Sequence, residues 1–215
     1  AGVAWPRWEG HGPLSFVGEL RCDRLSAYEL DVPVPNSGRL LFFYFDGSYD
    51  DGETVVGAWD PATLAGARTL HVLDDGAPGA EVVPEGLTPY PERLLAGRTV
   101  VTAPEWEDDE DLYDELVEAL HERHDGPVHQ VGGYADAAQG PVEHEVAEAA
   151  LGGDVSYEDP RLEAEARRWR LLLQVDSDDE VGMAWGDSGI LYWLARPEDL
   201  ERGDVSQVSF TWQSH

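Results

Sequence analysis

Two stretches of this sequence, far apart in the chain, follow the same order of residues. Phe16-Val-Gly-Glu-Leu-Arg21 resembles Leu171-Leu-Leu-Gln-Val-Asp176, and Ser37-Gly-Arg-Leu-Leu-Phe-Phe43 resembles Ser188-Gly-Ile-Leu-Tyr-Trp-Leu194. Each stretch is an apolar run with a polar side chain at its fourth position, then a connection, then Ser-Gly and a second apolar run. A repeat of this kind indicates two related structural units. The alternative is a chance similarity between short apolar strands.

The hydrophobic pattern predicts antiparallel strands in both halves. Apolar and polar residues alternate over residues 13–22, which is typical of a half-buried strand, whereas the unbroken apolar run 39–45 is typical of a central strand. Further strands are expected at 54–59, 69–73, 98–102, 169–176, 190–195 and 204–212. Helical turns are expected at 143–151 and 160–168.

A strongly acidic segment, residues 105–125, separates the two halves. Leu112, Leu116 and Leu120 recur at helical spacing, and the segment contains eleven acidic residues and one arginine. Its acidic residues come first and its histidines last, an order that the helix dipole favours. We therefore expect an α+β fold of two related, mainly antiparallel β units packed together with a few helices. A single domain over 1–215 is predicted, with halves of roughly 1–104 and 127–215 linked by the acidic helix 105–125.

The charge of the chain restricts its partners. Forty-four acidic residues against fourteen basic ones give a net charge of −30. Binding to nucleic acid and to anionic membrane surfaces requires clustered cations, so neither partner is expected. A basic protein is the partner that such a charge would attract over long range, and the alternative is that the charge serves solubility alone. The single cysteine, Cys22, excludes an intrachain disulfide, and we expect a soluble, cytoplasmic protein.

Several motifs resemble those of the YwqG-like family of bacterial proteins. They are Trp5-Pro6, Pro13–Leu20, Gly38–Phe43, His129–Tyr134 with Gln139, Leu171–Asp176 and Trp185–Tyr192. Two departures matter: Glu19 replaces the glutamine usual in the first motif, and relatives carry a further segment before Trp5. The resemblance implies an α+β fold with two related halves. It implies no activity, although some family members look like immunity proteins encoded beside secreted toxins.

Other motifs suggest chemistry only weakly. His144-Glu-Val-Ala-Glu148 has glutamate where a zinc protease helix needs its second histidine, and His121 and His124 fit helix capping better than a zinc site. The acidic run Asp176–Asp187 could bind Ca²⁺ weakly, but a solvated hairpin loop is favoured. Gly132-Gly133 could offer backbone donors to an anion, but a turn with positive φ, with Tyr134 packed beneath it, is favoured. No cofactor or metal is expected.

The candidate ligand site follows from the repeat. Gln174 and Asp176 share one strand face, Glu19 and Arg21 share the matching face of the related strand, and aromatic residues flank both. If the two halves pack as related units, these side chains could converge on a cleft between them. The candidate cleft residues are Trp5, Glu19, Arg21, Tyr134, Gln139, Gln174, Asp176, Trp185 and Asp187. The alternative is a buried hydrogen-bond network that fixes the strand register.

Two functional hypotheses follow. The first is a non-enzymatic protein-binding module, of the toxin-neutralising kind, whose acidic surface binds a basic partner. Its candidate partner-binding residues are Glu107, Asp108, Asp109, Glu110 and Asp111. The alternative is an enzyme that binds a small ligand or a metal in the cleft between the two halves.

Overall fold

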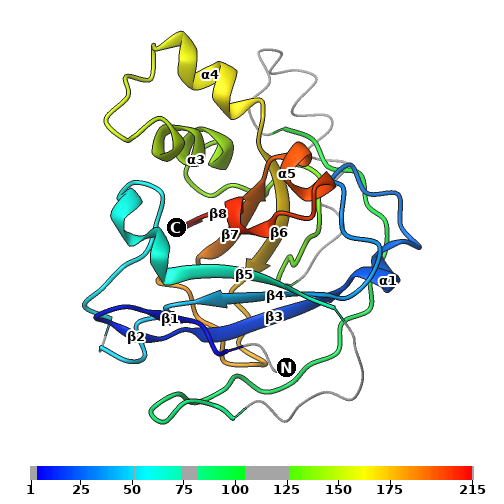
Figure 1. Cartoon of the computed structure of the whole chain (residues 1–215), viewed down its shortest axis with the longest axis vertical. Coiled ribbons are helices and arrows are strands. Elements are labelled where there is room, and N and C mark those ends of the chain that lie inside the picture. The colour runs from blue at the N-terminus through cyan, green and yellow to red at the C-terminus, as the bar shows by residue number, and fades with distance from the viewer. Residues whose placement is uncertain (1–3, 51, 74–81, 105–125, 215) are drawn as a thin grey trace.

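The computed structural model describes residues 4–50, 52–73, 82–104 and 126–214 (Figure 1). In these ranges it contains a two-stranded hairpin and two three-stranded antiparallel sheets. The hairpin pairs β1 (Arg7–Trp8) with β2 (Gly12–Pro13). The predicted acidic helix 105–125 and the candidate residues Glu107–Asp111 lie outside the described residues.

The first sheet, called here the first β unit, has the strand order β3-β4-β5. Its strands are β3 (Ser15–Arg21), β4 (Arg39–Tyr44) and β5 (Ala67–Val72). The short helix α1 (Cys22–Leu25) follows β3, and the 3-10 turn η1 (Pro61–Gly66) leads into β5. Residues 54–59 and 98–102 lie outside the described strands, contrary to the sequence prediction. In the first case Gly57 N donates to the Thr63 hydroxyl at 3.0 Å, within a local turn.

The second sheet, called here the second β unit, has the strand order β6-β7-β8. Its strands are β6 (Arg170–Asp176), β7 (Ile190–Ala195) and β8 (Ser209–Gln213). Helices α3 (Val142–Ala150) and α4 (Pro160–Ala166) precede it. Helix α5 (Pro197–Glu201) and the 3-10 turn η2 (Val205–Gln207) connect β7 to β8.

The two β units share their hydrogen-bond register as well as their strand order. Glu19 pairs with Leu41 in the first, and Gln174 pairs with Tyr192 in the second, as the sequence repeat would place them. Each first strand contains a bulge at the same position, between Phe16 and Gly18 in β3 and between Leu171 and Leu173 in β6. Because register fixes which side chains share a face, the two units are related residue by residue.

A matched glycine immediately precedes the second strand of each unit: Gly38 before β4 and Gly189 before β7. Cys22 N donates to Gly38 O at 3.0 Å, and Ser177 N donates to Gly189 O at 3.1 Å. A Cβ at Gly38 would lie 2.5 Å from the carbonyl oxygen of Val72, and one at Gly189 would lie 2.5 Å from that of Gln213. Glycine is therefore required at both positions because the third strand passes too close for a side chain.

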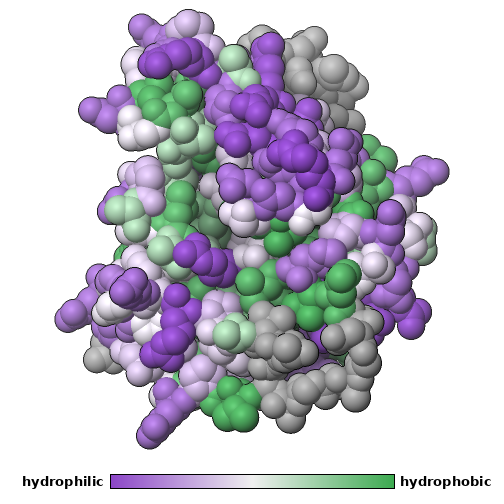
Figure 2. All heavy atoms as spheres, viewed as in Figure 1, coloured by the Kyte–Doolittle hydropathy of each residue, from purple (hydrophilic) through white to green (hydrophobic). Residues whose placement is uncertain are grey.

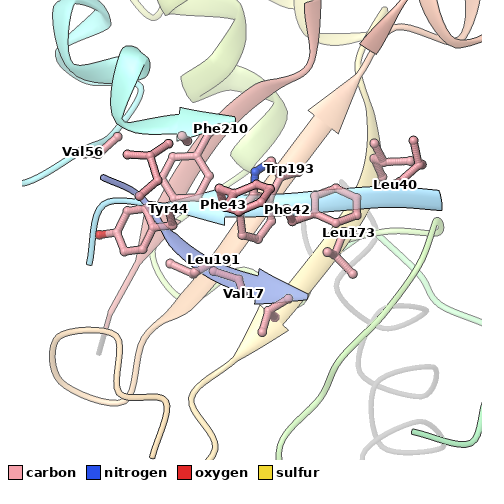
Figure 3. Close-up of a cluster of buried hydrophobic side chains, with 14 of the residues drawn as sticks. Val17, Leu40, Phe42, Phe43, Tyr44, Val56, Leu173, Leu191, Trp193 and Phe210 are labelled. Atoms are coloured by element: carbon pink, nitrogen blue, oxygen red, sulfur yellow. The ribbon is translucent and has the colours of Figure 1, made fainter. Parts of the chain in front are cut away.

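The two β units pack face to face through aromatic side chains (Figure 3). Phe42 lies edge-on to Trp193 with ring centroids 5.3 Å apart, and Tyr44 lies 5.0 Å from Phe210. The strands of the two sheets cross steeply there (Figure 3). Buried side chains of this size each contribute about 1.5–3 kcal/mol through removal of apolar surface from water.

The opposite face of the second β unit is covered by helices α3 and α4. Val146 and Leu162 from the helices pack with Tyr192 and Leu194 from β7. Every residue of β7 is therefore buried, which explains its continuous apolar sequence.

Candidate functional site

Gln174 is the most completely buried of the predicted cleft residues, with no exposed surface. Its backbone N–H donates to Gln130 O at 2.8 Å, and Gln130 N donates back at 3.0 Å, so residue 130 extends the sheet beyond β6. The side-chain Nε2 donates to Val128 O at 3.1 Å, and Oε1 accepts from Asp136 N at 2.9 Å. The amide therefore fixes residues 128–136 against the edge of the second β unit.

Asp176 binds the same segment from the end of β6. Its Oδ2 accepts from Val128 N at 2.9 Å, and its backbone N–H donates to Nδ1 of His129 at 3.2 Å. Because Nδ1 is an acceptor, the neutral imidazole carries its proton on Nε2, which faces Asp178 Oδ2 at 3.6 Å. Asp178 is 6% exposed and also accepts from Glu180 N at 2.9 Å. These contacts make the start of the 177–189 loop an ordered hairpin.

The Gly132-Gly133 turn has positive φ at both residues, +69° and +74°. Its backbone donors have intramolecular acceptors: Gly133 N donates to Asp31 Oδ1 at 2.7 Å, and Tyr134 N donates to the Thr102 hydroxyl at 2.9 Å. The carboxylate of Asp31 thus occupies the position that a bound anion would take. The Tyr134 side chain is 50% exposed, so it does not pack beneath the turn as its sequence suggested.

Trp185 belongs to the aromatic core rather than to an open surface. It is 3% exposed, with its ring 5.9 Å from Tyr44 and 5.7 Å from Tyr90. The Tyr90 hydroxyl donates to Asp46 Oδ2 at 2.6 Å. Burial alone would raise the pKa of Asp46, but hydrogen bonds from Ser48, Tyr90 and Ser15 more than offset it and keep the pKa below its usual value. Asp187, two residues after Trp185, is exposed.

Gln139 joins a polar network at the end of β8. Its backbone N–H donates to Gln213 Oε1 at 2.9 Å, and its Nε2 donates to Ser214 O at 2.6 Å. Gln213 Nε2 in turn donates to Glu145 Oε1 at 2.7 Å, and the Thr211 hydroxyl donates to Glu145 Oε2. Burial raises the pKa of Glu145, and these two hydrogen bonds offset the effect only in part. Sequence reasoning missed Glu145 and Gln213, because nothing in their local pattern distinguishes them from the many other acids and amides.

The predicted residues of the first half have local partners. Arg39 donates to Glu19 at 3.1 Å, and Arg21 donates to Asp23 at 3.3 Å. The Trp5 indole N–H donates to Leu14 O at 2.7 Å, and its ring lies 5.5 Å from Phe43. Glu19 is exposed whereas Gln174 is buried, so the two matching positions have different surroundings. A cleft shared by both strands therefore stays a prediction.

The site residues together form two kinds of structure. Gln174, Asp176 and Gln139 are polar anchors whose hydrogen bonds hold loops onto the second β unit. Trp5 and Trp185 pack in or against the core, while Tyr134 and Asp187 face solvent. A separate depression of about 510 Å³ lies between residues 33–36 and residues 200–203 and includes none of the predicted residues. Among the residues that the structure describes, no group of three or more His, Cys, Asp or Glu side chains is arranged to hold a metal ion.

Comparison with protein families gives a match over nearly the whole chain. A model of a domain of unknown function (DUF1963) matches residues 1–214. The chain belongs to this family. No curated protein matches the DUF1963 chain. Within the described ranges, every helix of this DUF1963 domain is too short or too polar to cross a bilayer.

Proposed function

We propose that this DUF1963 protein is a non-enzymatic binding module whose acidic surface recognises a basic protein. Its few cations support this proposal, because most of them are neutralised within the chain. Carboxylates of the same chain pair with Arg21, Arg24, Arg39, Arg93, Arg161, Arg167, Arg168, Arg196 and Arg202. Carboxylates outnumber arginines by thirty in the whole chain, so this pairing leaves a large negative surplus, and the net charge of −30 acts outward.

Hydrophilic residues gather over α5 and η2 on the face drawn in Figure 2. The greatest density of acidic residues in the sequence is at 105–125, which makes Glu107–Asp111 the proposed centre of the binding surface. The resemblance to the YwqG-like family, in which some members look like immunity proteins, makes a cationic toxin the proposed partner and the cytoplasm the proposed location.

The alternative, an enzyme acting between the two halves, has less support. The seam between the two sheets is filled by the side chains of Phe42, Trp193, Tyr44 and Phe210. A reaction in this seam would first require these aromatic rings to separate.

The decisive experiment compares two variants of equal net charge. The first neutralises the proposed centre with Glu107→Gln, Asp108→Asn, Asp109→Asn, Glu110→Gln and Asp111→Asn. The control neutralises five exposed glutamates elsewhere with Glu9→Gln, Glu29→Gln, Glu53→Gln, Glu85→Gln and Glu92→Gln. Affinity for a partner purified from the source cell is measured by calorimetry between low and physiological salt.

The first variant should bind more weakly than the control and show a flatter dependence of affinity on salt, because fewer fixed charges attract the partner. Equal affinity in the wild type and the first variant would refute the proposal. Equal losses in both variants would show that only total charge matters and would remove the proposed centre.

A further inference from the structure

Trp59 is an exposed tryptophan that the structure holds in place. Its side chain is 55% exposed, and its ring lies 5.9 Å from that of Trp212 at an interplanar angle of 65°. Trp59 precedes η1 and Trp212 lies on β8, and these two elements are neighbours on the left of Figure 1, below α3. Trp59 thus leaves more than half of its large apolar side chain open to solvent, whereas Trp212 is half-buried against the core.

The turn that carries Trp59 is held by several hydrogen bonds. Asp60 N donates to Gly57 O at 3.2 Å, and the Thr63 hydroxyl donates to Asp60 O at 2.7 Å. Ala58 is 2% exposed and packs with α3. The indole folds over Gly57, where a Cβ would lie only 2.2 Å from the ring. A ring fixed in this way loses little conformational entropy when a partner binds to it.

Trp212 is supported from behind in the same manner. A Cβ at Gly186 would lie 2.8 Å from its ring, so the backbone of the 177–189 loop packs directly on the indole. The following residue, Asp187, is exposed, and the network of Gln139 and Gln213 borders the end of β8. Gln139 therefore bonds to the two residues that follow Trp212 in the chain, and Asp187 follows the glycine that packs on its ring.

Exposed carboxylates lie on the segments that carry or contact the two rings. Asp60 follows Trp59 in the chain and is exposed, and Asp187 follows the glycine that contacts Trp212. Asp154, also exposed, follows Gly153, whose Cβ position is 3.8 Å from Pro61 of the same turn. A cation placed on the indole faces would therefore gain from the π system and from nearby negative charge.

The same protein contains such a contact internally. The guanidinium carbon of Arg196 lies 4.3 Å from the centre of the Trp169 ring while Arg196 also donates to Glu165. Trp59 offers an exposed indole, with the exposed Asp60 next to it in the chain, to a cation from another molecule.

We infer that Trp59 and Trp212 form the docking point for an arginine or lysine side chain of a basic protein partner. The inference rests on the proposed function and specifies where on the described surface the partner binds. The segment 105–125 supplies long-range attraction, and the tryptophan pair supplies a short-range contact that salt screens less. Tryptophan is also among the residues most often found at the energetic centre of protein interfaces.

The test uses a nona-arginine peptide as the probe and a nona-citrulline peptide as its uncharged control. Trp59→Ala should weaken binding of nona-arginine by about 3- to 30-fold, the range that one cation–π contact gives, and should leave the salt dependence unchanged. Trp59→Phe should weaken it less. Tyr157→Ala, which removes another exposed aromatic ring, should have no effect. Circular dichroism and melting temperature confirm that each variant is folded.

The outcomes separate this inference from the proposed function. If Trp59→Ala binds nona-arginine as wild type does while neutralisation of 107–111 weakens binding, the docking point is wrong and the acidic binding module stands. If the wild-type protein does not bind nona-arginine at low salt, both the docking point and the proposed acidic binding function are refuted. Binding of a neutral oligosaccharide such as cellohexaose that Trp59→Ala abolishes would make the pair a sugar platform and would overturn the inference.

Discussion

Glu19 and Gln174 occupy the same position in the two β units but have different surroundings. Gln174 is fully buried with both ends of its amide bonded, whereas Glu19 is exposed and pairs with Arg39. Gln174→Ala should lower the free energy of unfolding by about 2–4 kcal/mol, because it leaves Val128 O and Asp136 N unpaired and opens a cavity. Urea denaturation measures the change.

Glu19→Ala provides the matched control for this prediction. It should change the free energy of unfolding by less than about 1 kcal/mol, because an exposed ion pair contributes little. Equal losses in the two variants would contradict the assignment of Gln174 as the anchor of residues 128–136.

Glu145 gives the protein a specific pH dependence. Because burial raises its pKa in the folded state, its contribution to stability is complete below the unfolded pKa and is lost as pH rises through the folded pKa. Glu145→Gln keeps partners for Thr211 and Gln213 without the buried charge. The variant should therefore be more stable than wild type at pH 8, and the difference should shrink toward pH 4.

Urea midpoints of both proteins at pH 4, 6 and 8 test this expectation. Glu158→Gln removes an exposed carboxylate and serves as the control for net charge. A constant difference between Glu145→Gln and wild type at all three pH values would show that the carboxyl does not titrate abnormally.

At the scale of the elements, the repeated glycines explain why the two β units have the same register. Gly38→Ala and Gly189→Ala should each destabilise the protein by more than about 2 kcal/mol, because the new Cβ would overlap the carbonyl oxygen of Val72 or Gln213. Gly18→Ala should change stability by less than about 1 kcal/mol, since no atom lies within 4 Å of its Cβ position. Thermal melting of the three variants distinguishes them, and a tolerated Gly189→Ala would mean that β8 is not held where the structure has it.

The strands of both units could be predicted from the sequence because the spacing of apolar residues and the Ser-Gly dipeptide before each second strand are local signals. Whether the polar residue at the fourth position of the repeated run is buried could not be predicted, because its burial depends on which sheet edge another segment covers. Residues 128–136 cover β6, so Gln174 is inside and Glu19 is not. The run 54–59 has strand-like composition, yet its backbone bonds to the Thr63 hydroxyl instead. Gln174 and Asp176 both bond to Val128, which their shared strand face is consistent with, but the candidate ligand site stays a prediction. Trp59 and Glu145 carry no local signal in the sequence.

At the scale of the whole molecule, one excess of charge acts on both binding and stability. A net charge of −30 on 215 residues repels itself in the compact state more than in the expanded unfolded chain. Added salt screens this repulsion, so melting temperature should rise from 10 mM to 300 mM NaCl, by roughly 2–4 °C for each kcal/mol gained. Chloride is the anion of choice because sulfate would also strengthen apolar burial.

KCl at matched ionic strength controls for effects of a particular cation, because screening depends on ionic strength and not on which monovalent cation supplies it. The five-site neutralised variant at 107–111 should show a smaller rise in melting temperature than wild type, since it begins with less repulsion. A melting temperature that falls with NaCl would mean that the internal arginine–carboxylate pairs outweigh the surplus charge. The electrostatic field of the net negative charge would then be too weak to attract the proposed basic partner over long range.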